Sequence, residues 1–278
     1  MKFAGLIVLL GASVGIAAAQ QPTIRQQQGV ENAASYSTSN PPGSLVAIFG
    51  SNFSSETLTA SSTPLTLQIQ SKTETISVTV NGKEAPMFYA TPNQASVQLP
   101  WETVTGNGSI VLTRNGVKSS AYAFPVATFS PGIYTTTQDG KGMAWVINNN
   151  DGTVAQPSAG WPFPKIQTRP AKAGDNLFFY ITGLGPVSPS IEDGHAPCLL
   201  SGCPANVVLP KATNTVTVLI GGVAIPSGNV QFAGLSPQFV GTYQVNFKMP
   251  SGVPASNTTT LQVGVGNATS NTVTFATQ

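Results

Sequence analysis

The stretch QASVQLP at residues 94–100 occurs a second time, as QVNFKMP at residues 244–250. In both copies apolar residues stand three and five positions after the glutamine, and a proline ends the segment. This alternation is typical of a β-strand with one face in a core. Proline has no N–H group, so it fits at the end of a strand, where no further backbone hydrogen bond to a neighbouring strand is donated. The repeat predicts a chain built from two copies of one strand-rich unit.

The repeat extends to both sides of these stretches. Residues 43–53 align without a gap on residues 174–184, and residues 78–86 match residues 218–226 in length. The second copy is longer because it carries two additional loops, one before residue 218 and one after residue 226.

The first copy alternates short apolar segments with turn signals. Asn81-Gly82 and Asn115-Gly116 are strong hairpin signals, and no segment has helical periodicity. Strands are predicted at residues 45–49, 76–80, 87–89, 94–98, 109–113 and 121–126. Strands at this spacing indicate antiparallel sandwiches, so the predicted fold is all-β, with two tandem immunoglobulin-like β-sandwiches.

The N-terminus has the features of a secretory signal peptide. Lys2 precedes an apolar run at residues 3–18, and Ala17-Ala18-Ala19 fits an A-x-A cleavage site. We predict a signal peptide at residues 1–19 and cleavage after Ala19; the alternative is a membrane anchor. No second apolar run of about twenty residues follows, so we expect a soluble mature chain without a membrane span.

The remaining chain is divided by composition. Residues 20–40, rich in Gln, Ser and Asn, are predicted to be a flexible leader. Residues 41–127 form the first predicted domain and residues 128–278 the second. The second begins with a hairpin, and the proline-rich segment at residues 157–170 is predicted to be an extended connection that joins the sandwiches rigidly.

The charge pattern excludes one class of partner. Lys and Arg number 12 and Asp and Glu 10, the formal net charge is +2, and charged residues make up 8% of the chain, against about 25% in an average globular protein. The cations are scattered singly from Arg25 to Lys248. A nucleic-acid-binding surface needs clustered cations, so we exclude nucleic acid as a partner. A neutral polar surface is typical of a secreted β-protein.

Catalytic patterns are sparse. His195 is the only histidine, and the motifs of serine hydrolases, zinc proteases, P-loops and dinucleotide-binding folds are absent. Most of the carboxylates stand beside turns, which favours solvated turn residues over the facing pair of a glycosidase. We therefore predict a protein that is not an enzyme and has no cofactor or metal.

One loop differs from the rest of the chain. Residues 190–203 hold the only two cysteines, the only histidine and two adjacent acids. In an exported chain, Cys198 and Cys203 are expected to form a local disulfide. Asp193 and His195 are candidate ligand contacts, because binding residues concentrate on loops of rigid scaffolds. The alternative is a surface loop that the disulfide holds in place and that has no binding role.

Aromatic residues are the other candidates. Trp161 and Phe163 lie among prolines, and an exposed Trp161 could stack on a sugar ring. The alternative is burial in a core or between domains. Trp101 and Trp145 are expected to be structural.

Several segments resemble known families. Residues 42–53, 78–82 and 115–120 resemble IPT/TIG domains, which are immunoglobulin-like sandwiches. A closer resemblance is to an uncharacterised C-terminal domain of many secreted acidobacterial (Solibacter-type) proteins. The segments that carry it are residues 32–36, 42–50, 98–102, 130–134, 182–187 and 232–235. The resemblance implies the fold and export, and it brings no catalytic residues.

Together these features predict a secreted binding module, extracellular or periplasmic, that serves cell-surface adhesion or contacts carbohydrate or the envelope. Its partner would be an extracellular polysaccharide or a secreted or surface protein. The alternative function is a structural or assembly domain that binds another secreted protein through an exposed sheet edge. A glycan hydrolase is the third reading.

Overall fold

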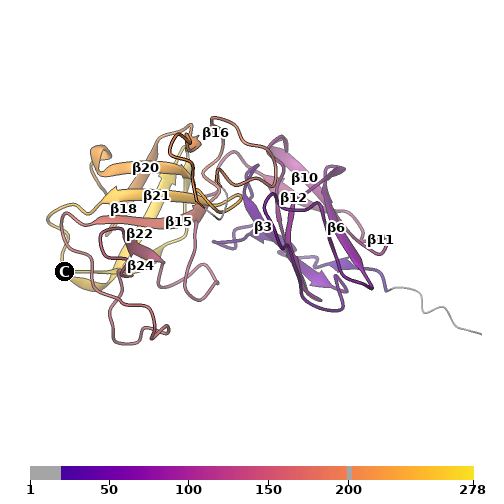
Figure 1. The fold of residues 1–278 in the computed structure, drawn as a ribbon, viewed down its shortest axis with the longest axis horizontal. Coiled ribbons are helices and arrows are strands. Elements are labelled where there is room, and N and C mark those ends of the chain that lie inside the picture. Colours follow the sequence, from indigo (N-terminus) through magenta and orange to yellow (C-terminus); the bar gives the residue numbers. More distant parts are fainter. Residues whose placement is uncertain (1–19, 199–201) are drawn as a thin grey trace, which may run out of the picture.

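The computed structural model describes residues 20–198 and 202–278, and the predicted signal peptide at residues 1–19 lies outside these residues. Two β-rich bodies lie side by side along the long axis of the molecule (Figure 1). The first contains the strands before residue 127 and the second those after residue 131. Among the described residues, no helix has the length and apolar character needed to cross a membrane.

The first sandwich consists of two sheets of six strands each. One sheet contains β1 (Thr23–Ile24), β2 (Val30–Asn32), β3 (Leu45–Ser51), β4 (Leu58–Thr59), β8 (Met87–Ala90) and β9 (Gln94–Gln98). The other contains β5 (Gln68–Gln70), β6 (Thr75–Val80), β7 (Lys83–Glu84), β10 (Gly106–Arg114), β11 (Val117–Lys118) and β12 (Tyr122–Val126).

The second sandwich has sheets of seven and five strands. The larger sheet contains β13 (Gly132–Ile133), β14 (Val146–Asn148), β15 (Asn176–Thr182), β16 (Val187–Ser188), β17 (Lys211–Ala212), β20 (Val230–Leu235) and β21 (Tyr243–Lys248). The smaller contains β18 (Val216–Ile220), β19 (Val223–Ala224), β22 (Ser256–Val265), β23 (Ala268–Thr269) and β24 (Val273–Thr277). A short 3-10 turn, η1 (Ser227–Asn229), precedes β20.

The two sandwiches repeat one strand register. Phe49 pairs with Gln94 in the first, and Tyr180 pairs with Gln244 at the equivalent place in the second. All ladders between named strands are antiparallel. The predicted all-β, immunoglobulin-like sandwich class is confirmed.

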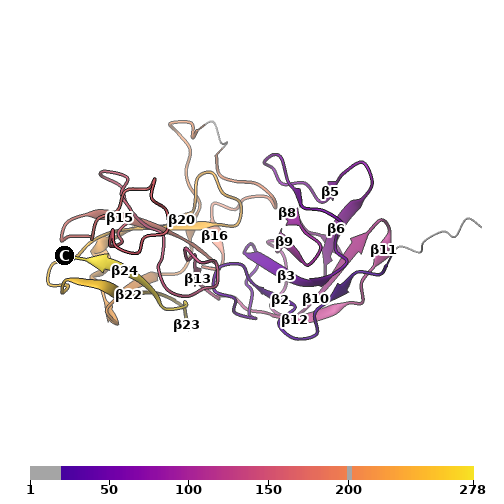
Figure 2. The same cartoon turned by 90° about the horizontal axis from the view of Figure 1, so that it is seen from below.

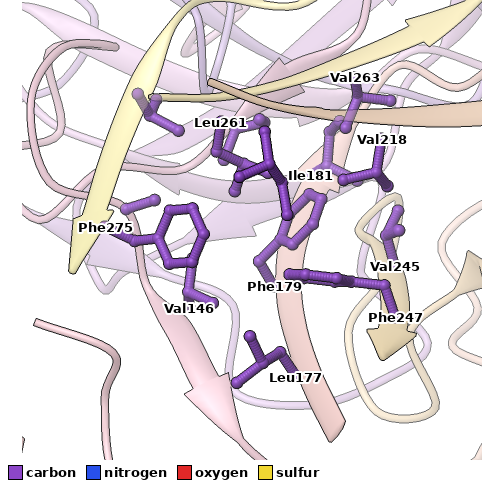
Figure 3. Close-up of a cluster of buried hydrophobic side chains, with 14 of the residues drawn as sticks. Val146, Leu177, Phe179, Ile181, Val218, Val245, Phe247, Leu261, Val263 and Phe275 are labelled. Atoms are coloured by element: carbon purple, nitrogen blue, oxygen red, sulfur yellow. The ribbon is translucent and has the colours of Figure 1, made fainter. Parts of the chain in front are cut away.

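Each sandwich has its own hydrophobic core. Alternation in β15 turns Leu177, Phe179 and Ile181 inward, where they are fully or almost fully buried. Figure 3 shows the ring of Phe179 beside that of Phe247, and their centroids are 6.0 Å apart. The core of the first sandwich draws in the same way on inward residues such as Val78 of β6. Trp101, which follows β9 of the first sandwich, is partly buried and packs against the core of the second, so the two sandwiches adjoin at this residue.

Residues 20–40 differ from the flexible leader expected there. β1 and β2 both pair with β3, and Ile24, Val30 and Asn32 are buried. The segment is mostly polar, but its few apolar residues are enough to order it, because pairing with β3 satisfies the hydrogen-bonding groups of its backbone.

The passage between the sandwiches also differs from the expected proline-rich connection. The chain crosses at residues 127–131, whereas residues 157–170 lie between β14 and β15 of the second sandwich. At the crossing, the ring of Phe129 is bounded by Gly185 and Gly266, where a Cβ atom would lie within 2.6–2.7 Å of the ring. Both glycines have positive φ angles, so the close approach and the backbone each favour glycine.

Candidate functional site

A loop of the second sandwich docks on the first sandwich. The carboxylate of Asp193 accepts hydrogen bonds from the backbone N–H of Trp101 (2.8 Å) and from Nζ of Lys83 (2.7 Å). Lys83 also pairs with Glu102. Burial alone lowers the pKa of Lys83, but these two carboxylates raise it above its ordinary value. Asp193, which the sequence predicts as a ligand contact, thus links the second sandwich to the first.

Gly194 extends this contact. Its N–H donates to Oε1 of the fully buried Gln98 (2.7 Å), and its carbonyl accepts from the N–H of Leu65 (2.8 Å). The φ of Gly194 is +75°, a conformation that favours glycine. We call the contacts of Asp193 and Gly194 with the first sandwich the clasp. β16, the strand that precedes this loop, lies at the end of the second sandwich that faces the first (Figure 1 and Figure 2).

The other predicted residues of the loop lie beside the clasp. His195 is partly exposed, and its Nδ1 lies 3.1 Å from the backbone oxygen of Asp193. Cys198 and Cys203 form the predicted disulfide, and the N–H of Cys198 donates to the carbonyl of Pro237 (2.7 Å). The disulfide therefore closes the loop immediately after the clasp.

Replacing Cys198 by serine is expected to leave the β-fold intact and to loosen only its loop. The entropy of a ring this short corresponds to about 2 kcal/mol. Hydrogen exchange should increase around residues 195–203 and remain unchanged in β15 and β21. The Cys198→Ser/Cys203→Ser double variant controls for the free thiol. Global unfolding of either variant at room temperature would contradict this prediction.

A cavity lies between the sandwiches, and residues of both contribute to its walls. Its volume is about 420 Å³. Its aromatic walls are Tyr36, Phe88, Tyr89, Tyr134 and Trp145, and we call it the junction cleft. The first three come from the first sandwich, whereas Tyr134 and Trp145 come from the segment that leads to β14.

The floor of the junction cleft is the outer side of the sheet that contains β3 and β9. Ala47 and Ser96 form a register pair there, and the side chain of Gln94 lies further along the same face. Gln138 adds a second amide from the opposite wall. The cleft therefore combines aromatic rings with uncharged hydrogen-bonding groups, the usual composition of a small-molecule site.

Two residues of the cleft have unusual backbone angles. Tyr36 has φ +59° and Gln138 has φ +55°, both in the left-handed region that bulky residues seldom adopt. The N–H of Tyr36 donates to the carbonyl of Asn32 (3.0 Å), and its ring stacks on Phe49 at 6.3 Å. Such angles persist where the surroundings hold them, and they concentrate at functional sites.

The tyrosines of the cleft are neutral. Burial raises the pKa of Tyr36, and the negative charges of Glu31 and Asp139 raise it further. Burial also raises the pKa of Tyr89 and of Tyr134. At neutral pH their hydroxyl groups are therefore protonated and able to donate as well as accept hydrogen bonds.

Trp161 lies in an aromatic cluster next to the cleft. Its ring is 5.3 Å from that of Trp145 and 5.3 Å from that of Phe163. It is partly exposed, and its indole N–H is buried without a hydrogen-bond partner among the described residues. Trp161 thus supports Trp145, which itself lines the cleft.

Sequence reasoning missed most of this site. The sequence predicts a structural role for Trp145 and does not point to Tyr36, Tyr89 or Tyr134. In the sequence Trp145 stands in a continuous apolar run at residues 143–147, so no alternation marks it. Its place outside the core follows only from the structure, in which Ala144 and Val146 are both fully buried and leave Trp145 on the opposite face. The tyrosines lie far apart in the sequence and have no local signal either.

The described residues contain no cluster of metal-binding side chains. Within residues 20–198 and 202–278, no group of three or more His, Cys, Asp or Glu side chains could hold a metal ion.

Part of the chain matches a known domain family. Residues 34–126 match the IPT/TIG domain family. No curated protein is significantly similar to the chain.

The solved structures with a distant likeness to this chain include two surface glycan-binding proteins. SGBP-B of the mixed-linkage glucan utilization locus of Bacteroides ovatus, in complex with a mixed-linkage heptasaccharide, is 14% identical with a TM-score of 0.32; the match covers 86% of this chain and 43% of that one. The surface glycan-binding protein PbSGBP-B from Prevotella bryantii is 15% identical with a TM-score of 0.26, and the match covers 91% and 41%. The chain spans less than half of each of these proteins. No function follows from likeness at this level.

Proposed function

We propose that this protein is a secreted, non-catalytic binding module that holds a neutral polysaccharide in the junction cleft. The observation that carries the proposal is the junction cleft itself, in which five aromatic side chains and two glutamines meet between two sandwiches. The clasp supports the proposal further, because it holds the two walls in a fixed relation before a ligand arrives.

Sugars fit the chemistry of this cleft. An aromatic ring offers a large apolar face, suited to the C–H face of a sugar ring, and a tyrosine adds a polar tip. Gln94 and Gln138 each carry a donor and an acceptor, as sugar hydroxyls do. The neutral hydroxyl groups of Tyr36 and Tyr89 match an uncharged ligand.

Secretion is supported by the Cys198–Cys203 disulfide, since disulfides persist in oxidising compartments.

A non-catalytic role is supported by the contacts of three carboxylates. Glu74, Asp175 and Asp193 each accept a hydrogen bond from an Arg or Lys side chain. We therefore assign them structural roles, and we expect an extracellular or periplasmic location.

The test is a binding screen of residues 20–278 against neutral and charged polysaccharides by affinity electrophoresis and against envelope fractions by pull-down, followed by calorimetry. Tyr89→Ala and Trp145→Ala should each weaken glycan binding about tenfold or more, because each removes an enclosing ring worth about 1.4 kcal/mol. Trp161→Ala should weaken it less, through loss of support for Trp145. The control Val223→Ala changes an exposed side chain outside the cleft and should bind normally.

Two outcomes would overturn the proposal. If no glycan is retained but an envelope protein is, the module serves assembly. If new reducing ends appear during incubation and Glu31→Gln or Asp139→Asn abolishes them, the protein is a hydrolase. These two carboxylates are the ones to test because their negative charges raise the pKa of Tyr36, a wall of the cleft.

A further inference from the structure

The second sandwich has an outer face equivalent to the floor of the junction cleft. In the repeated register, Ala47 opposite Ser96 corresponds to Phe178 opposite Asn246. Likewise Phe49 opposite Gln94 corresponds to Tyr180 opposite Gln244. We call this side of the sheet the second outer face, defined by Ile147, Phe178, Tyr180, Gln244 and Asn246.

Aromatic rings and amides alternate on the second outer face. The rings of Phe178 and Tyr180 are 5.7 Å apart, and Tyr180 contacts Phe239 at 5.5 Å. All three rings are at least partly exposed, and 46% of Phe239 is accessible. Beside this row, Nε2 of Gln244 donates to Oδ1 of Asn246 (2.7 Å).

A second pair of amides lies across the same sheet. Nε2 of Gln231 donates to Oδ1 of Asn176 (3.1 Å), and both residues belong to strands that flank β21. Each bonded amide pair keeps unused donors and acceptors for a ligand. The five residues that define the face are uncharged, and the exposed Lys248, which pairs with Asn176, adds one cation at the end away from Tyr180. Because the rest of the face carries rings and amides, an uncharged, hydroxyl-rich partner matches it.

The second outer face begins at the junction cleft. Ile147 pairs with Phe178, and Trp145, two residues earlier, therefore lies on the same side of the sheet. Trp145 also lines the cleft. Tyr134, another wall of the cleft, donates its N–H to the carbonyl of Tyr180 (3.3 Å). The two aromatic surfaces thus share Trp145 and adjoin at Tyr180.

We infer that the binding site continues from the junction cleft across the second outer face, so that the ligand is a long, neutral, unbranched glycan bound along its chain and not at one end. This inference rests on the proposed function. The four adjacent strands β14, β15, β21 and β20 span about 14 Å at the usual strand spacing. The cleft and the face together therefore exceed the reach of a single sugar ring.

The test measures the dependence of affinity on chain length. Trimers and hexamers of β-linked glucose, xylose and mannose are titrated by calorimetry, together with the parent polymers. We expect a hexamer to bind at least tenfold more tightly than its trimer. Phe178→Ala and Asn246→Ala should remove this advantage and leave trimer binding unchanged, whereas Tyr89→Ala should weaken both. Thermal unfolding and near-ultraviolet circular dichroism confirm that each variant is folded.

The outcomes separate the two proposals. If trimer and hexamer bind equally, or if Phe178→Ala and Asn246→Ala both bind the hexamer like the wild type, the extension is wrong and the junction cleft remains the site. If the wild type binds no oligosaccharide and no polymer of the series, the glycan-binding proposal fails, and the extension fails with it.

Discussion

Phe179→Ala is expected to lower the free energy of unfolding of the second sandwich by about 3–5 kcal/mol. The side chain is fully buried between the two sheets, where its ring packs at 6.0 Å from that of Phe247. Removing it leaves a cavity that the surrounding strands close only in part. The loss is a large fraction of the roughly 5–15 kcal/mol that stabilises a typical domain. Urea unfolding followed by circular dichroism and tryptophan fluorescence measures it.

The matched control is Phe178→Ala, one residue earlier on the same strand. Its side chain points to the second outer face and is partly exposed, so the expected loss is about 1 kcal/mol or less. Equal losses in the two variants would show that the alternation assigned to β15 is wrong. Since Phe178→Ala also tests the extended glycan site, its expected stability makes any loss of binding interpretable.

Asp193→Ala is expected to release the second sandwich from the first. The substitution removes the acceptor of the Trp101 N–H and one of the two carboxylates that hold Lys83. An unsatisfied donor of this kind costs about 1–3 kcal/mol. Small-angle scattering should show a larger radius of gyration, and thermal unfolding should separate into two transitions. The cleft should lose its fixed walls, and glycan affinity should fall with it.

Glu192→Ala is the control for this prediction. Its side chain is 87% exposed and belongs to the same loop, so its removal should leave scattering and unfolding unchanged. A wild-type scattering profile for Asp193→Ala would show that Gly194, Gln98 and Phe129 hold the junction without the carboxylate.

Much of the fold follows from short-range patterns. The alternation at residues 76–80 and the Asn81-Gly82 turn are sufficient to predict β6 and its hairpin, because both depend on a few neighbouring residues. The alignment of the two copies predicts equivalent strands, and the register pairs of Phe49 and Tyr180 agree with it. Residues 20–40 escaped this approach because only isolated apolar residues mark β1 and β2.

The candidate site was much less predictable. Trp161 is a predicted sugar contact because it stands among prolines, and its ring packs on that of Trp145, which lines the junction cleft. Asp193 is a predicted ligand contact because of its loop, and its carboxylate accepts a hydrogen bond from Trp101, 92 residues away in the sequence. In both cases the sequence identifies the kind of residue, but the contacts of its side chain involve residues far away in the chain and cannot be read from its neighbours.

The amino-acid sequence by itself determined the β-class, the internal repeat, the equivalence of the strands in the two copies and the pairing of Cys198 with Cys203. These features depend on alternation, turn chemistry and proximity along the chain, which are local properties. Only the tertiary structure decided how the two sandwiches meet and therefore that Tyr36, Tyr89 and Trp145 share one cleft. That meeting depends on the clasp and on the packing of Phe129, contacts between residues far apart in the chain whose complementarity exists only once both sandwiches have folded.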